Sequence, residues 1–247
     1  MIQIEQIIIL FSVGVIAGFI NVMAGGGSAL TLPMLIFMGL EGSLANGTNR
    51  VAIFIQNVFA VSSFHQKKFH ALKQSFLYAA MTLPGAILGA LVAVRISDEL
   101  FENILAVIIV GIIITLFLPG QKHKDHDRIK ASKWLFPALF AVGFYGGFIQ
   151  MGVGFILMAA LYHLAHYNLV HVNMHKVAIV LIYTIPALLI FILSGNVNWP
   201  LGIALAAGNA TGGWWGAHVT IRGGEKWIKI ALAVAMILMA SKLVGIY

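Results

Sequence analysis

Ten apolar segments separated by short polar breaks account for most of the chain. They cover approximately residues 4–24, 28–40, 48–64, 74–94, 100–118, 134–151, 154–166, 177–193, 200–221 and 227–245. Most of them reach the roughly 20 residues that a helix needs to cross a hydrocarbon core about 30 Å thick. The second and the seventh do not, because about 12 residues at about 1.5 Å each cover only about 18 Å. The pattern predicts an all-α polytopic membrane protein.

A run of three glycines, Gly25, Gly26 and Gly27, separates the first two segments and is followed by Ser28. Each glycine costs about 1 kcal/mol relative to alanine inside a helix, so the run predicts a break, with Ser28 as the N-cap of the next helix. Amides at a break cannot face lipid, and those at a helix start favour an anion. Two interpretations follow, a ligand site built from backbone or a tight interhelical turn that binds nothing.

Three sequence patterns recur at an offset of about 126–127 residues. Val51-Ala52-Ile53 returns as Val177-Ala178-Ile179, Gly85-Ala86-Ile87-Leu88-Gly89-Ala90 as Gly212-Gly213-Trp214-Trp215-Gly216-Ala217, and Gly25-Gly26-Gly27 falls on Gly152-Val153-Gly154. A shared register of this kind indicates an internal duplication. We expect a first repeat over residues 1–120, a basic cytoplasmic linker over 121–133 and a second repeat over 134–247, with five segments in each repeat.

An odd number of segments per repeat predicts that the second repeat is inverted relative to the first. If the loop at residues 65–73 is cytoplasmic, twelve of the fifteen Lys and Arg residues lie on that side, and only Arg50, Arg95 and Lys242 lie opposite. Cytoplasmic loops are enriched in Lys and Arg, so the charges agree with the inversion. The pattern predicts a multi-pass protein of the cytoplasmic (inner) membrane with both termini outside.

The short second and seventh segments predict one re-entrant hairpin per repeat, each broken at a glycine-rich turn. The two hairpins would enter from opposite faces and bring 25–28 and 150–154 together near the middle of the bilayer. Secondary transporters bind substrates at broken helices of this kind. The candidate substrate-binding residues are Gly25, Gly26, Gly27, Ser28, Asn49, Arg50, Gln56, Asn57, Gln150, Gly152, Gly154 and Lys176.

The glycine run continues as Gly-Gly-Gly-Ser-Ala-Leu-Thr-Leu-Pro, and the polar patch Ala45-Asn46-Gly47-Thr48-Asn49 comes after it. Together with the basic central linker and the second copy Gln150-Met151-Gly152-Val153-Gly154, these stretches resemble the TauE/SafE sulfite exporter family. The resemblance covers essentially the whole chain, and the first motif is the specific part of it. It implies a transporter that moves sulfite, sulfonates or related organosulfur anions across the cytoplasmic membrane.

Arg50 and Lys176 occupy equivalent positions at the predicted starts of the third and eighth segments. One interpretation makes them interfacial anchors whose side chains snorkel to the membrane surface. The other makes them a pair of cations at the two mouths of one anion pathway. Gln56 and Asn57 lie further into the third segment and are expected to bind the ligand or to hydrogen bond between helices, because bare amides are costly in hydrocarbon.

Other residue types narrow the chemistry. The chain has no cysteine, and no Asp or Glu lies deep in a predicted span, so a carboxylate proton relay is unsupported and an anionic substrate is favoured. His171 and His175 have the i, i+4 spacing of metal ligands, with His163 and His166 nearby. Polarity at the inner face or pH sensing explains these histidines without a carboxylate or thiol partner, so neither a metal nor a cofactor is expected.

The leading hypothesis is a secondary transporter for a small sulfur-containing anion, held by backbone amides of the two breaks. The alternative is an anion channel with the same hairpins as its filter. An enzyme is disfavoured, since the sequence contains no His-Glu-x-x-His, Gly-x-Ser-x-Gly or P-loop pattern. The expected partners are the small anion and the lipid bilayer but no nucleic acid, and homo-oligomerisation stays open.

Overall fold

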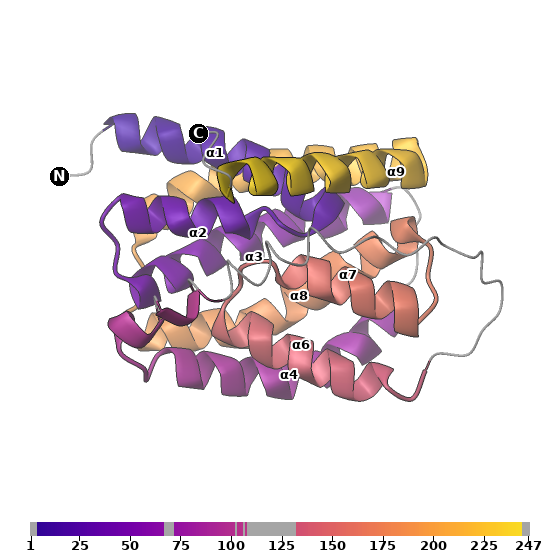
Figure 1. Ribbon diagram of the computed structural model, residues 1–247, viewed down its shortest axis with the longest axis horizontal. Coiled ribbons are helices and arrows are strands. Elements are labelled where there is room, and N and C mark those ends of the chain that lie inside the picture. The colour runs from indigo at the N-terminus through magenta and orange to yellow at the C-terminus, as the bar shows by residue number, and fades with distance from the viewer. Residues whose placement is uncertain (1–3, 67–71, 102, 106, 108–131, 244–247) are drawn as a thin grey trace.

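The structure, a computed structural model, describes residues 4–66, 72–101, 103–105, 107 and 132–243. All regular secondary structure in this part of the chain is helical (Figure 1). The helices are α1 (Ile4–Ala24), α2 (Ser28–Phe37), α3 (Gly42–Gln66), α4 (Leu72–Ala93), α6 (Leu135–Phe148), α7 (Val153–Leu164), α8 (Leu169–Leu193) and α9 (Trp199–Leu243).

Three of the described helices are long and apolar enough to cross a membrane: Ile4–Ala24, Lys73–Ala93 and Leu169–Leu193. Helix α3, with 25 residues, is also long enough to cross a membrane, but polar side chains interrupt its apolar sequence. Helices α2, α6 and α7 are apolar and shorter, with 10, 14 and 12 residues. The all-α membrane architecture expected from the sequence is confirmed.

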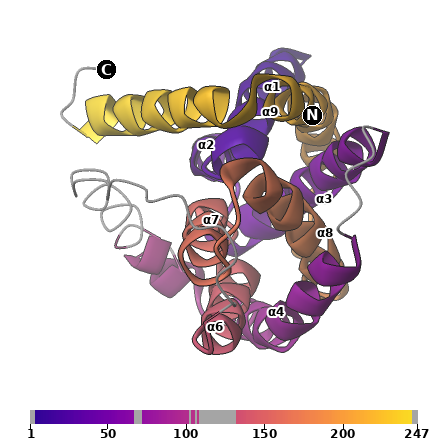
Figure 2. The same ribbon diagram turned by 90° about the vertical axis from the view of Figure 1, so that its right-hand side faces the viewer.

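Several helix boundaries differ from those predicted by hydropathy. Helices α3 and α8 begin at Gly42 and Leu169, well before the predicted residues 48 and 177, because the polar residues at their starts are helical and buried. The predicted break after residue 221 is wrong, since α9 is one helix of 45 residues. Figure 2 shows its yellow C-terminal part pointing away from the other helices. The predicted fifth segment and the linker at 121–133 lie mostly outside the described residues.

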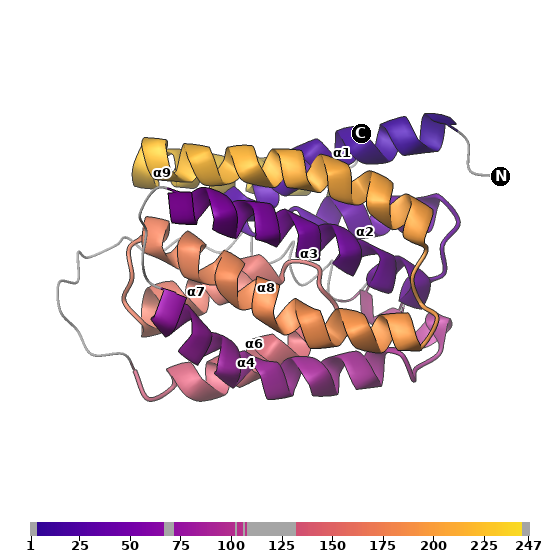
Figure 3. The same cartoon turned by 180° about the vertical axis from the view of Figure 1, so that it is seen from behind.

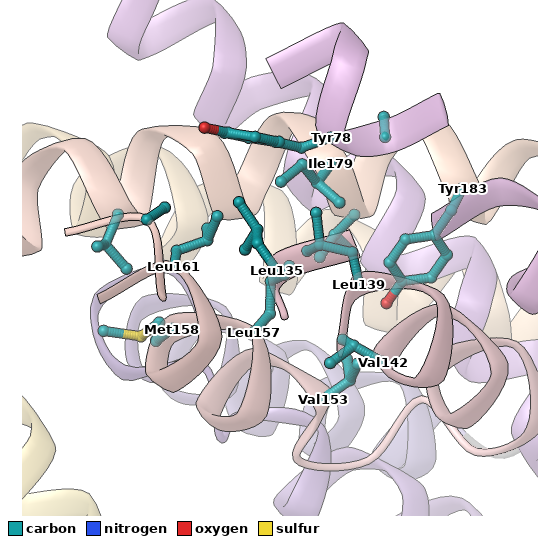
Figure 4. Packing of buried hydrophobic residues seen from close by; sticks show 14 of the residues in the cluster. Tyr78, Leu135, Leu139, Val142, Val153, Leu157, Met158, Leu161, Ile179 and Tyr183 are labelled. Carbon is teal, nitrogen blue, oxygen red and sulfur yellow. The ribbon is translucent and has the colours of Figure 1, made fainter. Parts of the chain in front are cut away.

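Helices α3 and α8 run through the centre of the bundle and contact each other. Helix α9 packs along α1 and α3, and α4 packs along α6 and α8 (Figures 1 and 3). The pairs α1/α2 and α6/α7 each form a hairpin at the side of this bundle. A buried apolar cluster that includes Leu139, Leu157 and Tyr183 joins α6 and α7 to α8 (Figure 4).

The repeated glycine motif of the sequence lies at close contacts between helices. Gly85 and Gly89 of α4 face the backbone of α6, and Gly212 of α9 faces the backbone of α1. A Cβ added to Gly212 would lie 2.8 Å from the amide nitrogen of Phe19. Small residues at four-residue spacing let two membrane helices pack backbone to backbone. The motif therefore explains how α4 and α9 hold the first helix of each hairpin.

Candidate functional site

The two glycine-rich breaks are in direct contact. A Cβ added to Gly25 would lie 2.7 Å from the Cα of Gly154, and a Cβ on Gly154 would lie 2.5 Å from the carbonyl oxygen of Gly25. Gly25 has φ +90° and Gly152 has φ +70°, a backbone region that glycine adopts without steric cost. Glycine is thus required at these breaks both for the turn and for the approach of one backbone to the other.

Ser28 joins the breaks through its side chain. Its hydroxyl donates to the carbonyl oxygen of Gln150 (3.1 Å) and accepts from the backbone N–H of Gly152 (3.3 Å). The predicted N-cap role of Ser28 is wrong, because Gly27 occupies that position, without a side-chain cap, and Ser28 is the first helical residue. The hydroxyl is therefore used between the two hairpins instead of within its own helix.

Arg50, on α3, binds the C-terminal end of α6. Its guanidinium donates to the carbonyl oxygens of Gly146 (3.1 Å), Gly147 (2.5 Å) and Phe148 (3.4 Å), and to Oε1 of Gln150 (2.9 Å). The last carbonyls of a helix have no partner within the helix and carry the negative end of its dipole. A buried cation at this position therefore stabilises the point where α6 ends.

Lys176, on α8, does the same for α1. Its ammonium donates to the carbonyl oxygens of Asn21 (3.0 Å) and Val22 (2.7 Å), and to Oδ1 of Asn173 (2.8 Å). Three oxygen acceptors match the three N–H groups of a lysine ammonium. The sulfur of Met158 lies 3.6 Å from the same nitrogen.

Both sequence-based interpretations of the two cations are wrong. Arg50 is 0% exposed and Lys176 is 3% exposed, so neither is an interfacial anchor or a charge at an open mouth. The helices that carry them begin earlier than predicted, which moves the two cations from helix starts into the interior. Because they are buried, the two cations no longer count in the comparison of Lys and Arg between the two predicted sides of the membrane. The remaining Lys and Arg still lie mostly on the predicted cytoplasmic side.

Two buried asparagines repeat the pattern of the cations. Asn46 on α3 donates to the carbonyl oxygen of Phe148 (2.8 Å), and Asn173 on α8 donates to that of Met23 (3.0 Å). Sequence analysis missed both residues as members of the site. The available signal was their position one helical turn before Arg50 and Lys176.

A small cavity lies beside the contact between the breaks. Its volume is about 10 Å³, which is room for about one water molecule. It is lined by Asn21, Ser28, Ile53, Asn57, Gln150, Val153, Gly154, Lys176 and Val180. Five of the candidate residues therefore meet around one space: Ser28, Asn57, Gln150, Gly154 and Lys176.

The other candidate residues lie around this cavity without lining it. Gly25, Gly26, Gly27 and Gly152 form the breaks themselves, and Arg50 contacts Gln150. Asn49 accepts a hydrogen bond from the hydroxyl of Thr31 on α2 (2.7 Å). Gln56 accepts from the side-chain amides of Asn21 and Asn209 (3.3 Å each), so it connects α1 and α9 to α3.

Tyr183 and Asn21 are further polar members of the site that the sequence analysis did not select. Nε2 of Gln150 donates to the hydroxyl of Tyr183 (3.3 Å), so the Gln150 side chain is held between Tyr183 and Arg50. Asn21 supplies both a carbonyl to Lys176 and an amide to Gln56. Its place at the end of an apolar helix gave no hydropathy signal.

Two histidines of the predicted cluster, His175 and His171, lie in different surroundings. His175 is 0% exposed, and its Nδ1 lies 2.8 Å from the hydroxyl of Ser75 on α4, with the ring of Tyr167 at 4.5 Å. His171 is half-buried and lies 2.8 Å, through its own Nδ1, from Oδ1 of Asn168. The described residues contain no group of three metal-ligating side chains.

Comparison with known proteins shows the family of this chain. Residues 10–243 match the family described as Sulfite exporter TauE/SafE. The chain belongs to this family. It is 31% identical over 238 residues to the probable membrane transporter protein YfcA of Escherichia coli K12, with 95% of this chain and 88% of the relative covered.

More distant relatives are similar over nearly the whole chain. A probable membrane transporter protein of Haemophilus influenzae is 29% identical over 98% of this chain and 96% of its own length. The probable membrane transporter protein YunE of Bacillus subtilis is 23% identical, with 96% and 97% covered. No solved structure gives a significant match. The protein is a TauE/SafE membrane transporter and not an enzyme.

Proposed function

We propose that this protein is a secondary transporter of a small sulfur-containing anion, such as sulfite or a sulfonate, in the cytoplasmic membrane. The anion would bind between the starts of α2 and α7, at the cavity that Ser28, Gln150, Gly154 and Lys176 line. The observation that carries the proposal is the convergence of two helix starts and a buried ammonium on one space. The family description supplies the sulfur chemistry.

Electrostatics at the cavity favours an anion. The backbone N–H groups of Ser28, Val153 and Gly154, in the first turns of α2 and α7, have no acceptor among the described residues. Such free amides and the positive end of the helix dipole attract negative charge. Lys176 adds a full positive charge, and the described part of the chain places no Asp or Glu at the cavity to oppose it.

The proposed pair of inverted repeats would explain why the contacts at the breaks occur in pairs. Arg50 and Asn46 of α3 bind the end of α6, while Lys176 and Asn173 of α8 bind the end of α1. Under the proposed duplication, the third helix of each repeat therefore holds the first helix of the other. Transporters built from inverted repeats place their substrate at such an interface.

The size of the cavity favours a carrier over a channel. Room for about one water molecule is too little for a sulfur oxyanion, so α2 and α7 must separate for the anion to enter. A channel filter would need a passage already wide enough for the ion. A site that opens to admit its substrate is the arrangement expected of alternating access.

Counterflow into liposomes that contain the purified protein tests this function. Vesicles loaded with unlabelled sulfite, thiosulfate or methanesulfonate are diluted into the labelled anion, and uptake is compared with acetate, phosphate and chloride. We expect saturable counterflow of at least one sulfur anion. Ionic current without counterflow would establish the channel instead, and exchange of none of the sulfur anions would overturn the proposed substrate class.

Lys176→Met tests the location of the site in the same assay. Removal of the one cation among the described residues that line the cavity should abolish counterflow. Lys133→Met removes an exposed lysine next to the start of α6 and should leave the rate unchanged. Equal loss in both variants would mean that net charge, and not this site, determines the flux.

A further inference from the structure

Lys176 is an ionisable cation in the cavity, and no counter-charge neighbours it among the described residues. Its three hydrogen-bond acceptors are two backbone carbonyls and one side-chain amide. A buried charge is costly unless it is paired as well as hydrogen bonded. In a protein that binds an anion at this cavity, the missing partner of the ammonium is the anion itself.

Few other charged or titratable groups face Lys176. Helix α1 presents the carbonyls of Asn21 and Val22, α7 presents Met158, and α3 presents Asn57 and Ile53 across the cavity. The neighbour in sequence, His175, turns toward Ser75 on α4. Beyond Gln150 lie Arg50 and Tyr183, which both bind that side chain.

The second buried cation, Arg50, differs from Lys176 in both chemistry and place. A guanidinium stays protonated in proteins, whereas a buried lysine can lose its proton. Arg50 does not line the cavity, and its partners are the carbonyls at the end of α6 and the side chain of Gln150. Arg50, whose charge is permanent, therefore holds the end of α6. Lys176, which can lose its proton, faces the space where the anion would lie.

We infer that Lys176 couples transport to protons, so that one proton travels with each anion. The inference rests on the proposed function of this cavity. The proton is taken from water on the loading side and forms the ammonium at Nζ of Lys176, where it compensates the bound anion. On the other side the anion leaves, the proton passes from Nζ to water, and the neutral amine remains.

Thermodynamic linkage makes this coupling reciprocal. If the anion binds more tightly to the ammonium than to the amine, the proton binds more tightly to the anion-loaded protein by the same factor. The empty protein returns with a neutral amine, because a buried ammonium without a counter-charge is unfavourable in a low dielectric. For a monovalent anion the loaded form carries no added charge, so net transport is electroneutral.

The test measures proton and anion movement together in liposomes held at zero membrane potential. Methanesulfonate and thiosulfate are suitable probes because both are fully ionised at neutral pH, so a proton that enters with them is carried by the protein. With the outside one pH unit more acidic, wild-type protein should accumulate methanesulfonate about tenfold. An internal pH dye should report one proton entering per anion.

Lys176→Arg separates proton coupling from a role of positive charge alone. The arginine keeps the charge but cannot release the proton, so accumulation driven by the pH gradient should fall to about the level of protein-free vesicles even when it is scaled by the counterflow rate that the variant itself shows. The control Lys133→Arg should behave as wild type. If only sulfite is transported, Lys176→Arg is still compared with the wild-type protein. Sulfite takes up protons in solution to the same extent in both experiments, so a difference in accumulation comes from the protein.

The outcomes distinguish this inference from the proposed function. Absence of counterflow in the wild-type protein would overturn the function itself. Counterflow in the wild-type protein without accumulation or proton entry would overturn proton coupling and leave the carrier intact. Accumulation that survives in Lys176→Arg would also overturn it, because the proton would then be carried by another group.

Discussion

Gly25 and Gly154 touch through their backbones, so that a Cβ on either residue would lie within 2.7 Å of a backbone atom of the other. These glycines belong to hairpins far apart in the sequence, and their contact aligns the starts of α2 and α7 at one cavity. The proposed site depends on this approach, because any side chain here would move the two helix starts apart.

Gly154→Ala should therefore lower the thermal unfolding midpoint in detergent and abolish anion exchange. Overpacking of a close contact costs about 1–3 kcal/mol, and the added methyl group meets backbone that cannot rotate away. Gly202→Ala is the matched control, because this buried helical glycine of α9 has 3.5 Å to its nearest neighbours. That variant should be neutral or slightly stabilised through the helix propensity of alanine.

Gly39 is not a suitable silent control, although its position near the end of α2 suggests one. No atom of the residues that the structure describes lies within 4 Å of an added Cβ, but Gly39 has φ +91°. An alanine in this region is strained by about 1 kcal/mol or more. We expect a measurable loss of stability in Gly39→Ala with unchanged anion exchange, measured by thermal unfolding and by counterflow.

Arg50→Met should destabilise the protein by several kcal/mol. The variant leaves buried acceptors at the end of α6 without a donor, at about 1–3 kcal/mol each. The control Arg95→Met removes an exposed arginine and should change the unfolding midpoint little. Because Arg50 is buried, the loss should not shrink at high salt, in contrast to an exposed charge. A loss that vanished in salt would restore the role of Arg50 as an entry charge.

Ser28→Ala removes the hydroxyl that joins the two breaks. The carbonyl of Gln150 loses a donor and the N–H of Gly152 loses an acceptor, at a cost of about 1–3 kcal/mol. Ser12→Ala is the control, since the hydroxyl of this exposed serine bonds within its own helix, to Ile8. Equal unfolding midpoints for the two variants would show that the bridge contributes no stability.

The sequence predicted the breaks well, because glycine runs and short apolar segments are local signals. It misplaced Arg50 and Lys176 for a physical reason: hydropathy treats a cation as a surface residue, whereas these two are buried against carbonyls at helix ends. The partner that makes such burial acceptable lies on another part of the chain. The same reason explains why the starts of α3 and α8 were placed too late.

The role of Ser28 was misjudged for a related reason. A serine after a glycine run is a common N-cap, and local sequence favours that use of its hydroxyl. In the folded chain the second break offers Gln150 and Gly152 to the same hydroxyl. The hydroxyl bonds to the second break instead of capping its own helix because the two hairpins lie close together. A local sequence pattern contains no information on that contact.

Orientation in the membrane is testable on this cysteine-free chain. The end of α3 and the connection from α8 to α9 lie at opposite ends of the bundle (Figure 3). With the N-terminus outside, Gln66→Cys should resist an impermeant thiol reagent applied to intact cells, and Ser194→Cys should react. Both side chains are exposed. The reverse labelling pattern would contradict the proposed orientation.

The location of a bound anion tests the central claim most directly. Selenite, the selenium analogue of sulfite, is first shown to compete for exchange and is then bound to the crystallised protein, where the anomalous signal of selenium locates it. We expect one peak between the first turns of α2 and α7, within hydrogen-bond distance of the Lys176 ammonium. A peak elsewhere in the bundle, with this cavity still closed, would contradict the account.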